Sequence, residues 1–117
     1  MNWKTAGLLI VMLLPSVAMA NVGVRDNLTI SLLSPMSSNR PSSTVNQGLT
    51  RVYFTASAAW GITGCRSDAG DVQAGDSNVL AAIMMAFATG KQIKVEVDDT
   101  LPTANSVCRI TAIYVYP

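Results

Sequence analysis

Residues 76–98 read DSNVLAAIMMAFATGKQIKVEVD, and this stretch sets the architecture because a helix pattern runs directly into a strand pattern. Ala, Leu and Met, which are strong helix formers, dominate residues 79–88. Asp76 is a suitable N-cap, and Gly90 suits the left-handed position that follows a last helical turn. We therefore predict a helix over residues 77–89.

The second part of the same stretch predicts a strand. Residues 92–98 alternate strictly between apolar and polar side chains, which is typical of a half-buried strand with Ile93, Val95 and Val97 facing inward. The helix before it has ten consecutive apolar residues and so lacks a polar face. Two explanations stay open: the helix lies in a groove of its own domain, or helix 77–89 forms a homo-oligomer interface.

Strand patterns also flank the helical segment. Alternating or β-branched stretches predict three strands before the helix and one at the end of the chain, at residues 22–33, 49–57, 58–63 and 107–116. Segments rich in Ser, Asn, Gly, Asp and Pro separate the strands and predict loops at 34–48 and 64–75. The chain is therefore mainly β with one helix, in the order β-β-β-α-β-β.

This order predicts a five-stranded OB-fold-like barrel, in which the sheet closes on itself and the helix plugs one end. The alternative is an open α+β sheet. Because the chain has only 117 residues, we expect a single domain over residues 21–117.

The first twenty residues do not fit a folded domain. Lys4 precedes an uninterrupted apolar run of nine residues, 6–14, and Ala18-Met19-Ala20 then offers small residues to a signal peptidase. A membrane-spanning helix needs about twenty apolar residues, so the run is too short for an anchor. We predict a signal peptide over residues 1–20 and export to the periplasm or the medium.

Two cysteines remain in the exported part, Cys65 and Cys108. An oxidising compartment favours a disulfide between them. A metal or redox pair is the alternative, but the chain has no His, and the two cysteines lie too far apart in the sequence for a C-x-x-C motif. We therefore predict a structural disulfide and no metal site.

Charge and chemistry narrow the function classes. The chain has eight basic and seven acidic residues, and since Lys4 lies in the leader, the exported part carries no net charge. A neutral domain without a basic cluster disfavours binding to nucleic acid or to a membrane surface. With no His, no free thiol expected, no nucleotide or hydrolase motif, and Asp98-Asp99 in a turn, we expect neither enzyme activity nor a cofactor.

Several features together resemble a known family. Trp60 stands shortly before Cys65, an apolar helix ends at 86–90 with AFATG, a charged alternating strand follows, and Cys108 opens the last strand. From Thr50 to Val115 this arrangement resembles the B subunits of bacterial AB-type toxins, of the subtilase cytotoxin and typhoid toxin kind. The resemblance implies an OB-fold that forms a five-membered ring and binds sialylated glycans.

The resemblance directs attention to the first strand and to aromatic side chains, where the family's glycan contacts lie. The candidate ligand-binding residues are Arg25, Asp26, Asn27, Tyr53 and Trp60. Trp60 either stacks on a sugar or packs in the core, and Tyr53 either binds a ligand or covers the strand surface. Tyr114 and Tyr116 either line an interface or cover the sheet. We expect a recognition module with a glycan or protein partner; the alternative is a non-enzymatic structural or interaction protein of the bacterial envelope.

Overall fold

The computed structural model describes residues 7, 21–100, 103 and 105–117. The predicted signal peptide therefore lies, apart from Gly7, outside the described residues, and its cleavage stays a prediction. Within the described part, no helix is both long enough and apolar enough to cross a membrane.

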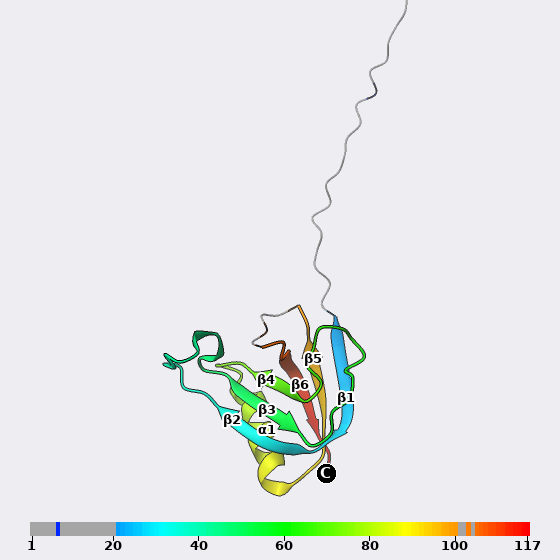
Figure 1. Cartoon of the computed structure of the whole chain (residues 1–117). Helices are drawn as coiled ribbons and strands as arrows, with labels where there is room; N and C mark the ends of the chain where they lie inside the picture. The colour runs from blue at the N-terminus through cyan, green and yellow to red at the C-terminus, as the bar shows by residue number, and fades with distance from the viewer. Residues whose placement is uncertain (1–6, 8–20, 101–102, 104) are drawn as a thin grey trace, which may run out of the picture.

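In the part of the chain that the structure describes, one sheet of six strands packs with one long helix (Figure 1). The strands are β1 (Val22–Leu28), β2 (Ile30–Pro35), β3 (Thr50–Phe54), β4 (Ala69–Val72), β5 (Ile93–Asp98) and β6 (Arg109–Val115). The helix is α1 (Ser77–Thr89), and a short 3-10 turn, η1 (Thr44–Asn46), lies in the loop before β3. The prediction of a mainly β protein with one helix is confirmed.

The sheet is mixed and open, with the strand order β1-β5-β6-β4-β3-β2. All neighbours are antiparallel except β4 and β6, which run parallel and share the single registered pair Asp71–Arg109. The predicted closed barrel of five strands is therefore not what forms. Asn27 adopts a left-handed φ of 56° within β1, at a register shift between Arg25 and Leu28. The first predicted strand is divided at Thr29 into β1 and β2.

The two halves of that first strand pair on opposite sides. Leu28 is registered with Ile93 of β5, whereas Ile30 is registered with Phe54 of β3. Only Thr29 separates β1 from β2 along the chain, so the two edges of the sheet are joined covalently. No ladder connects β1 to β2 in the described residues, and the sheet remains open there.

The prediction of a strand at residues 58–63 is wrong. Gly61 has a φ of 82°, and Trp60 turns its ring into the core, where it is 2 % exposed. Strand β4 takes the place of this third predicted strand, and it lies inside the segment predicted as a loop. Gly70 permits this because an added Cβ would lie 2.7 Å from Cγ1 of Ile110. A residue with any side chain would therefore collide with β6.

Helix α1 has the predicted bounds, and Gly90 ends it with a φ of 67°. Asp76, predicted as the N-cap, makes no capping hydrogen bond; its Oδ2 accepts from Arg109 at 3.2 Å. The helix buries Ile83 and Ala86 against the sheet. The described residues do not cover it on both sides, because Met84, Met85 and Phe87 are exposed.

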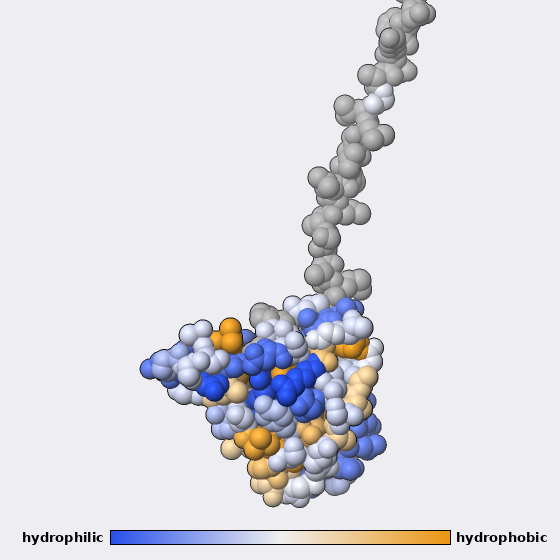
Figure 2. Space-filling model, in the orientation of Figure 1, coloured by the Kyte–Doolittle hydropathy of each residue, from blue (hydrophilic) through white to orange (hydrophobic). Residues whose placement is uncertain are grey.

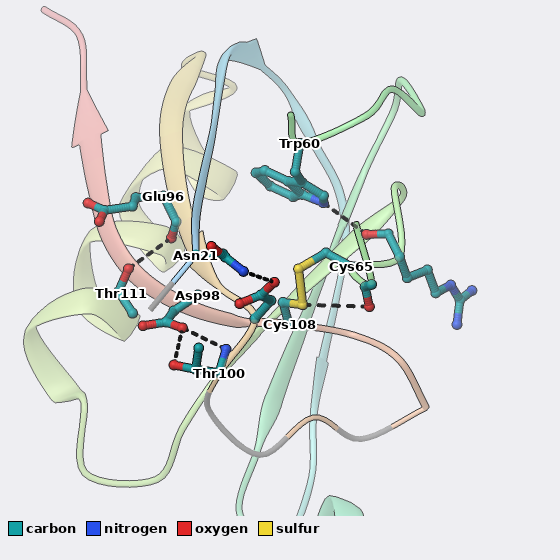
Figure 3. Close-up of a disulfide and its surroundings, with 11 residues drawn as sticks. Asn21, Trp60, Cys65, Glu96, Asp98, Thr100, Cys108 and Thr111 are labelled. Atoms are coloured by element: carbon teal, nitrogen blue, oxygen red, sulfur yellow. Dashed lines mark hydrogen bonds between the residues drawn. A yellow bond between two sulfur atoms is a disulfide. The ribbon is translucent and has the colours of Figure 1, made fainter. Parts of the chain in front are cut away.

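The core lies between α1 and the sheet. The three residues of β5 that were predicted to face inward, Ile93, Val95 and Val97, are fully buried. Residues of β3, α1 and β6 in the same core cluster are fully buried as well: Val52, Ile83 and Ile110. Cys65 and Cys108 form the predicted disulfide, with Cα atoms 5.3 Å apart. The bond joins the loop before β4 to the residue before β6 (Figure 3).

Candidate functional site

The three consecutive candidates of the first strand have different environments. Arg25 is buried, and its guanidinium donates to the carbonyl oxygens of Ser67 at 2.6 Å and Ala56 at 3.1 Å. It also lies 5.1 Å from the centre of the Trp60 ring. Arg25 therefore holds the loops after β3 against β1. Asp26 and Asn27 are exposed on the outer surface.

The aromatic candidates Trp60 and Tyr53 do not join Asp26 and Asn27. The buried indole of Trp60 donates from Nε1 to the carbonyl oxygen of Arg66 at 2.9 Å (Figure 3). Its ring meets Phe54 edge to face, with ring centres 5.9 Å apart. Tyr53 is half-buried on β3, with the guanidinium of Arg66 6.0 Å from its ring centre. Trp60 is thus a core residue, and we leave both aromatics out of the candidate site.

Asn27 does line a cleft of about 440 Å³. Its walls are Asn27, Lys91, Gln92, Tyr116 and Pro117. These residues come from the end of β1, the link between α1 and β5, and the chain after β6. The C-terminus lies beside the junction of β1 and β2 in Figure 1, where the three segments meet.

Local structure explains why these segments converge. Asn tolerates left-handed backbone better than most residues, and Asn27 occupies that conformation at the register shift of β1. Ile93 of β5 is registered with Leu28 on one side and with Val115 on the other. The residues just before Ile93 must therefore lie next to those just after Val115.

A carboxylate orients one wall of the cleft. Tyr116 donates from its hydroxyl to Oδ1 of Asp26 at 2.6 Å, and the backbone N–H of Asn27 donates to the same oxygen at 2.8 Å. These bonds, the one from Tyr116 foremost, lower the pKa of Asp26. The same carboxylate raises the pKa of the Tyr116 phenol. At neutral pH the pair is an ionised acceptor and a neutral donor, which fixes the position of the phenol ring.

A second phenol lies close to this cleft. Tyr114 is exposed and is registered with Lys94 on β5, whose Nζ lies 5.4 Å from the ring centre. Lys94 also contributes to the lowered pKa of Asp26 through its charge. The surface therefore combines two phenol rings with amide, ammonium and carboxylate groups. Such a set suits a polar ligand that offers hydroxyl groups and a small apolar face.

Sequence reasoning identified part of this site. Asp26 and Asn27 were candidates, whereas Tyr116 was expected either to line an interface or to cover the sheet. Lys91 and Gln92 were missed, and their only signal is their place between the helix end at Gly90 and the strand beginning at Ile93. Among the described residues, no group of three His, Cys, Asp or Glu side chains could hold a metal ion.

Comparisons with known proteins give no further guide to this cleft. No family model, no curated protein and no solved structure matches the chain.

Proposed function

We propose that this protein is an exported, non-enzymatic recognition module that binds a polar glycan in the cleft around Tyr116. The observation that carries the proposal is the Asp26–Tyr116 hydrogen bond of 2.6 Å, which holds an aromatic ring beside the amides of Asn27 and Gln92. Amides supply paired donors and acceptors for sugar hydroxyls, and an aromatic ring packs against the apolar face of a sugar. Lys91 adds a positive charge that favours an acidic sugar.

The strand order supports the same proposal. If β1 and β2 are counted as one bent strand, the order of the strands and the place of α1 before β5 are those expected for an OB-fold, although the sheet is open. The resemblance to toxin B subunits points in the same direction, towards sialylated glycans. The disulfide is typical of a protein that folds in an oxidising compartment, as expected for the periplasm or the medium.

The proposal predicts that a glycan array will give binding to acidic glycans. Replacing Tyr116 by Phe removes one hydroxyl and releases Asp26, and we expect an affinity loss of about tenfold, the worth of one hydrogen bond. Lys91→Ala should remove the preference for acidic over neutral sugars. Affinities from isothermal titration with the best glycan of the array provide the measurement.

Tyr53→Phe is the matched control, because it removes the same hydroxyl from a tyrosine on β3, outside the cleft. Its affinity should equal that of the unaltered protein. An array without any bound glycan, or equal losses for Tyr53→Phe and Tyr116→Phe, would overturn the proposal.

A second candidate function is assembly through helix α1. The helix carries no charged residue, and Met84, Met85 and Phe87 are exposed on it. Apolar residues gather at the end of the molecule where α1 lies (Figure 2). Exposed apolar patches usually mark contacts, so we propose that copies of this chain associate through this face.

Light scattering should then give a mass several times that of one chain. Met84→Glu places a charge on the apolar face and should reduce the mass to that of a monomer, with an unchanged circular dichroism spectrum. Val45→Glu is the control, because Val45 is also exposed but lies on η1 rather than on the helix. A monomeric unaltered protein would contradict this assembly.

A further inference from the structure

One carboxylate oxygen in the turn after β5 has no partner. Oδ1 of Asp99 is buried, and none of the described residues donates a hydrogen bond to it. The neighbouring Asp98 differs, because its Oδ1 accepts from the backbone N–H and the hydroxyl of Thr100, both at 2.7 Å (Figure 3). A buried carboxylate oxygen without a donor is costly, and such oxygens normally have one.

Asn21, which directly precedes β1, lies against this carboxylate. Its carbonyl oxygen accepts from the backbone N–H of Asp99 at 3.1 Å, and its Nδ2 donates to Oδ2 of Asp99 at 3.3 Å. The next residue, Val22, is registered with Asp98 on β5. Main-chain and side-chain bonds therefore hold Asn21 in place, and they keep its backbone nitrogen near the Asp99 carboxylate.

The predicted leader ends at the residue before this nitrogen. Cleavage after Ala20 converts the backbone nitrogen of Asn21 from an amide into an α-ammonium group. An amide has one N–H and no charge, whereas an α-ammonium group has three N–H donors and is largely protonated at neutral pH. Among the ion pairs of the described residues, none involves Asp99. A positive charge at residue 21 would thus meet a carboxylate that no Lys or Arg has neutralised.

We propose that leader cleavage creates an ion pair between the α-ammonium group of Asn21 and the carboxylate of Asp99, with the unpartnered Oδ1 as an acceptor. The inference rests on the export that forms part of the proposed function, and it is independent of glycan binding. The pair fastens the start of β1, an edge strand of the sheet, to the turn after β5. Chain termini usually fray, so the cleaved domain gains stability where it is otherwise weakest.

The test starts from protein recovered after export, whose mass should be that of a chain beginning at Asn21. Its α-amine is then acetylated near neutral pH, where an α-amine reacts in preference to lysine side chains. Acetylation removes the charge but leaves one N–H. It should raise the equilibrium constant for unfolding about fivefold in urea titrations, as expected for a partly exposed ion pair. The effect should shrink at high salt concentration, because salt screens the attraction.

Two variants show whether the effect comes from Asp99. Asp99→Asn keeps an acceptor for Nδ2 of Asn21 but removes the negative charge, so acetylation should no longer change its stability. Asp68→Asn is the matched control, because it removes a carboxylate that pairs with Arg66, and it should leave the fivefold effect intact. The proposal is overturned if acetylation leaves the unaltered protein unchanged or destabilises Asp99→Asn equally. A cleaved chain that begins at another residue also overturns it, whereas an uncleaved chain contradicts export itself.

A direct titration covers the case in which Asp99→Asn does not fold. Measured by NMR in the unaltered exported protein, the pKa of the α-ammonium group should lie above that of an unperturbed α-amino group, because a nearby carboxylate favours the charged form. The charged residues opposite the start of β1 are Asp98 and Asp99. Arg109, registered with Asp98 on β6, lies 3.2 Å from Asp76. An unperturbed or lowered pKa would show that no ion pair forms.

Discussion

Replacing Asp71 by Asn is expected to lower the free energy of unfolding by about 3 kcal/mol, because it leaves the buried guanidinium of Arg51 without its counter-charge. The pair is bidentate, with Nε to Oδ1 at 2.9 Å and the second nitrogen to Oδ2 at 3.0 Å. The two side chains are only 4 % and 5 % exposed. A guanidinium stays protonated in proteins even without a carboxylate beside it, so Arg51 cannot relieve the loss by deprotonation.

Urea denaturation monitored by Trp fluorescence measures the effect. The matched control is Asp68→Asn, which breaks the Arg66–Asp68 pair of similar length but 41 % and 36 % exposure. An exposed pair contributes less than about 1 kcal/mol, so this variant should be nearly neutral. The double variant Arg51→Met with Asp71→Leu should recover most of the stability, because apolar residues of similar volume can replace a buried ion pair. Equal losses for Asp71→Asn and Asp68→Asn would contradict this account.

The buried pair also fixes the long loop before β3. Arg51 donates to Oδ1 of Asn46 at 3.4 Å, and Asn46 donates to the hydroxyl of Ser43 at 3.0 Å. Asn46 belongs to η1 and is itself buried. The loop that the composition predicted as exposed is therefore tied to the sheet at its 3-10 turn.

Arg51 illustrates what sequence patterns can and cannot provide here. The strand predicted at residues 49–57 corresponds to β3, in which Val52 and Phe54 are buried. Arg51 alternates with them and so takes the other face, yet it is buried as well. Alternation describes only which face a side chain takes, and cannot tell that η1 covers that face.

Strand β4 was missed for a related reason. Its residues Gly70 and Asp71 have low strand propensity, and each is required by a contact with another element: Ile110 of β6 for Gly70, and Arg51 of β3 for Asp71. Helix α1 and strand β5 were predictable because their signals are local, namely composition, the Gly90 terminus and strict alternation. The cleft around Tyr116 was only partly predictable, since Lys91 and Gln92 reach it through the register of β5 with β6.

Removing the disulfide has the largest expected effect on stability. Replacing Cys65 and Cys108 together by Ala should lower the free energy of unfolding by about 4 kcal/mol in the chain-entropy model, for a closed loop spanning a separation of 43 residues. A reducing agent should destabilise the unaltered protein by a similar amount and leave the double variant unchanged. If reduction shifted the urea midpoint of both proteins equally, the shift would not come from this bond.

Hydrogen exchange can distinguish a local effect of the disulfide at the β4–β6 junction from a loss of stability over the whole sheet. The β4–β6 junction has one registered pair, next to the backbone bonds from Arg66 to Ser106 at 2.8 Å and from Asp71 to Cys108 at 3.0 Å. The disulfide reinforces this junction, whereas β1, β5 and β6 are joined by long antiparallel ladders. In the double variant, hydrogen exchange should therefore accelerate first at the amides of Arg66 and Asp71, while β5 stays protected. Uniform acceleration along all six strands would mean that the sheet unfolds as one unit and that the covalent link does not act at this junction.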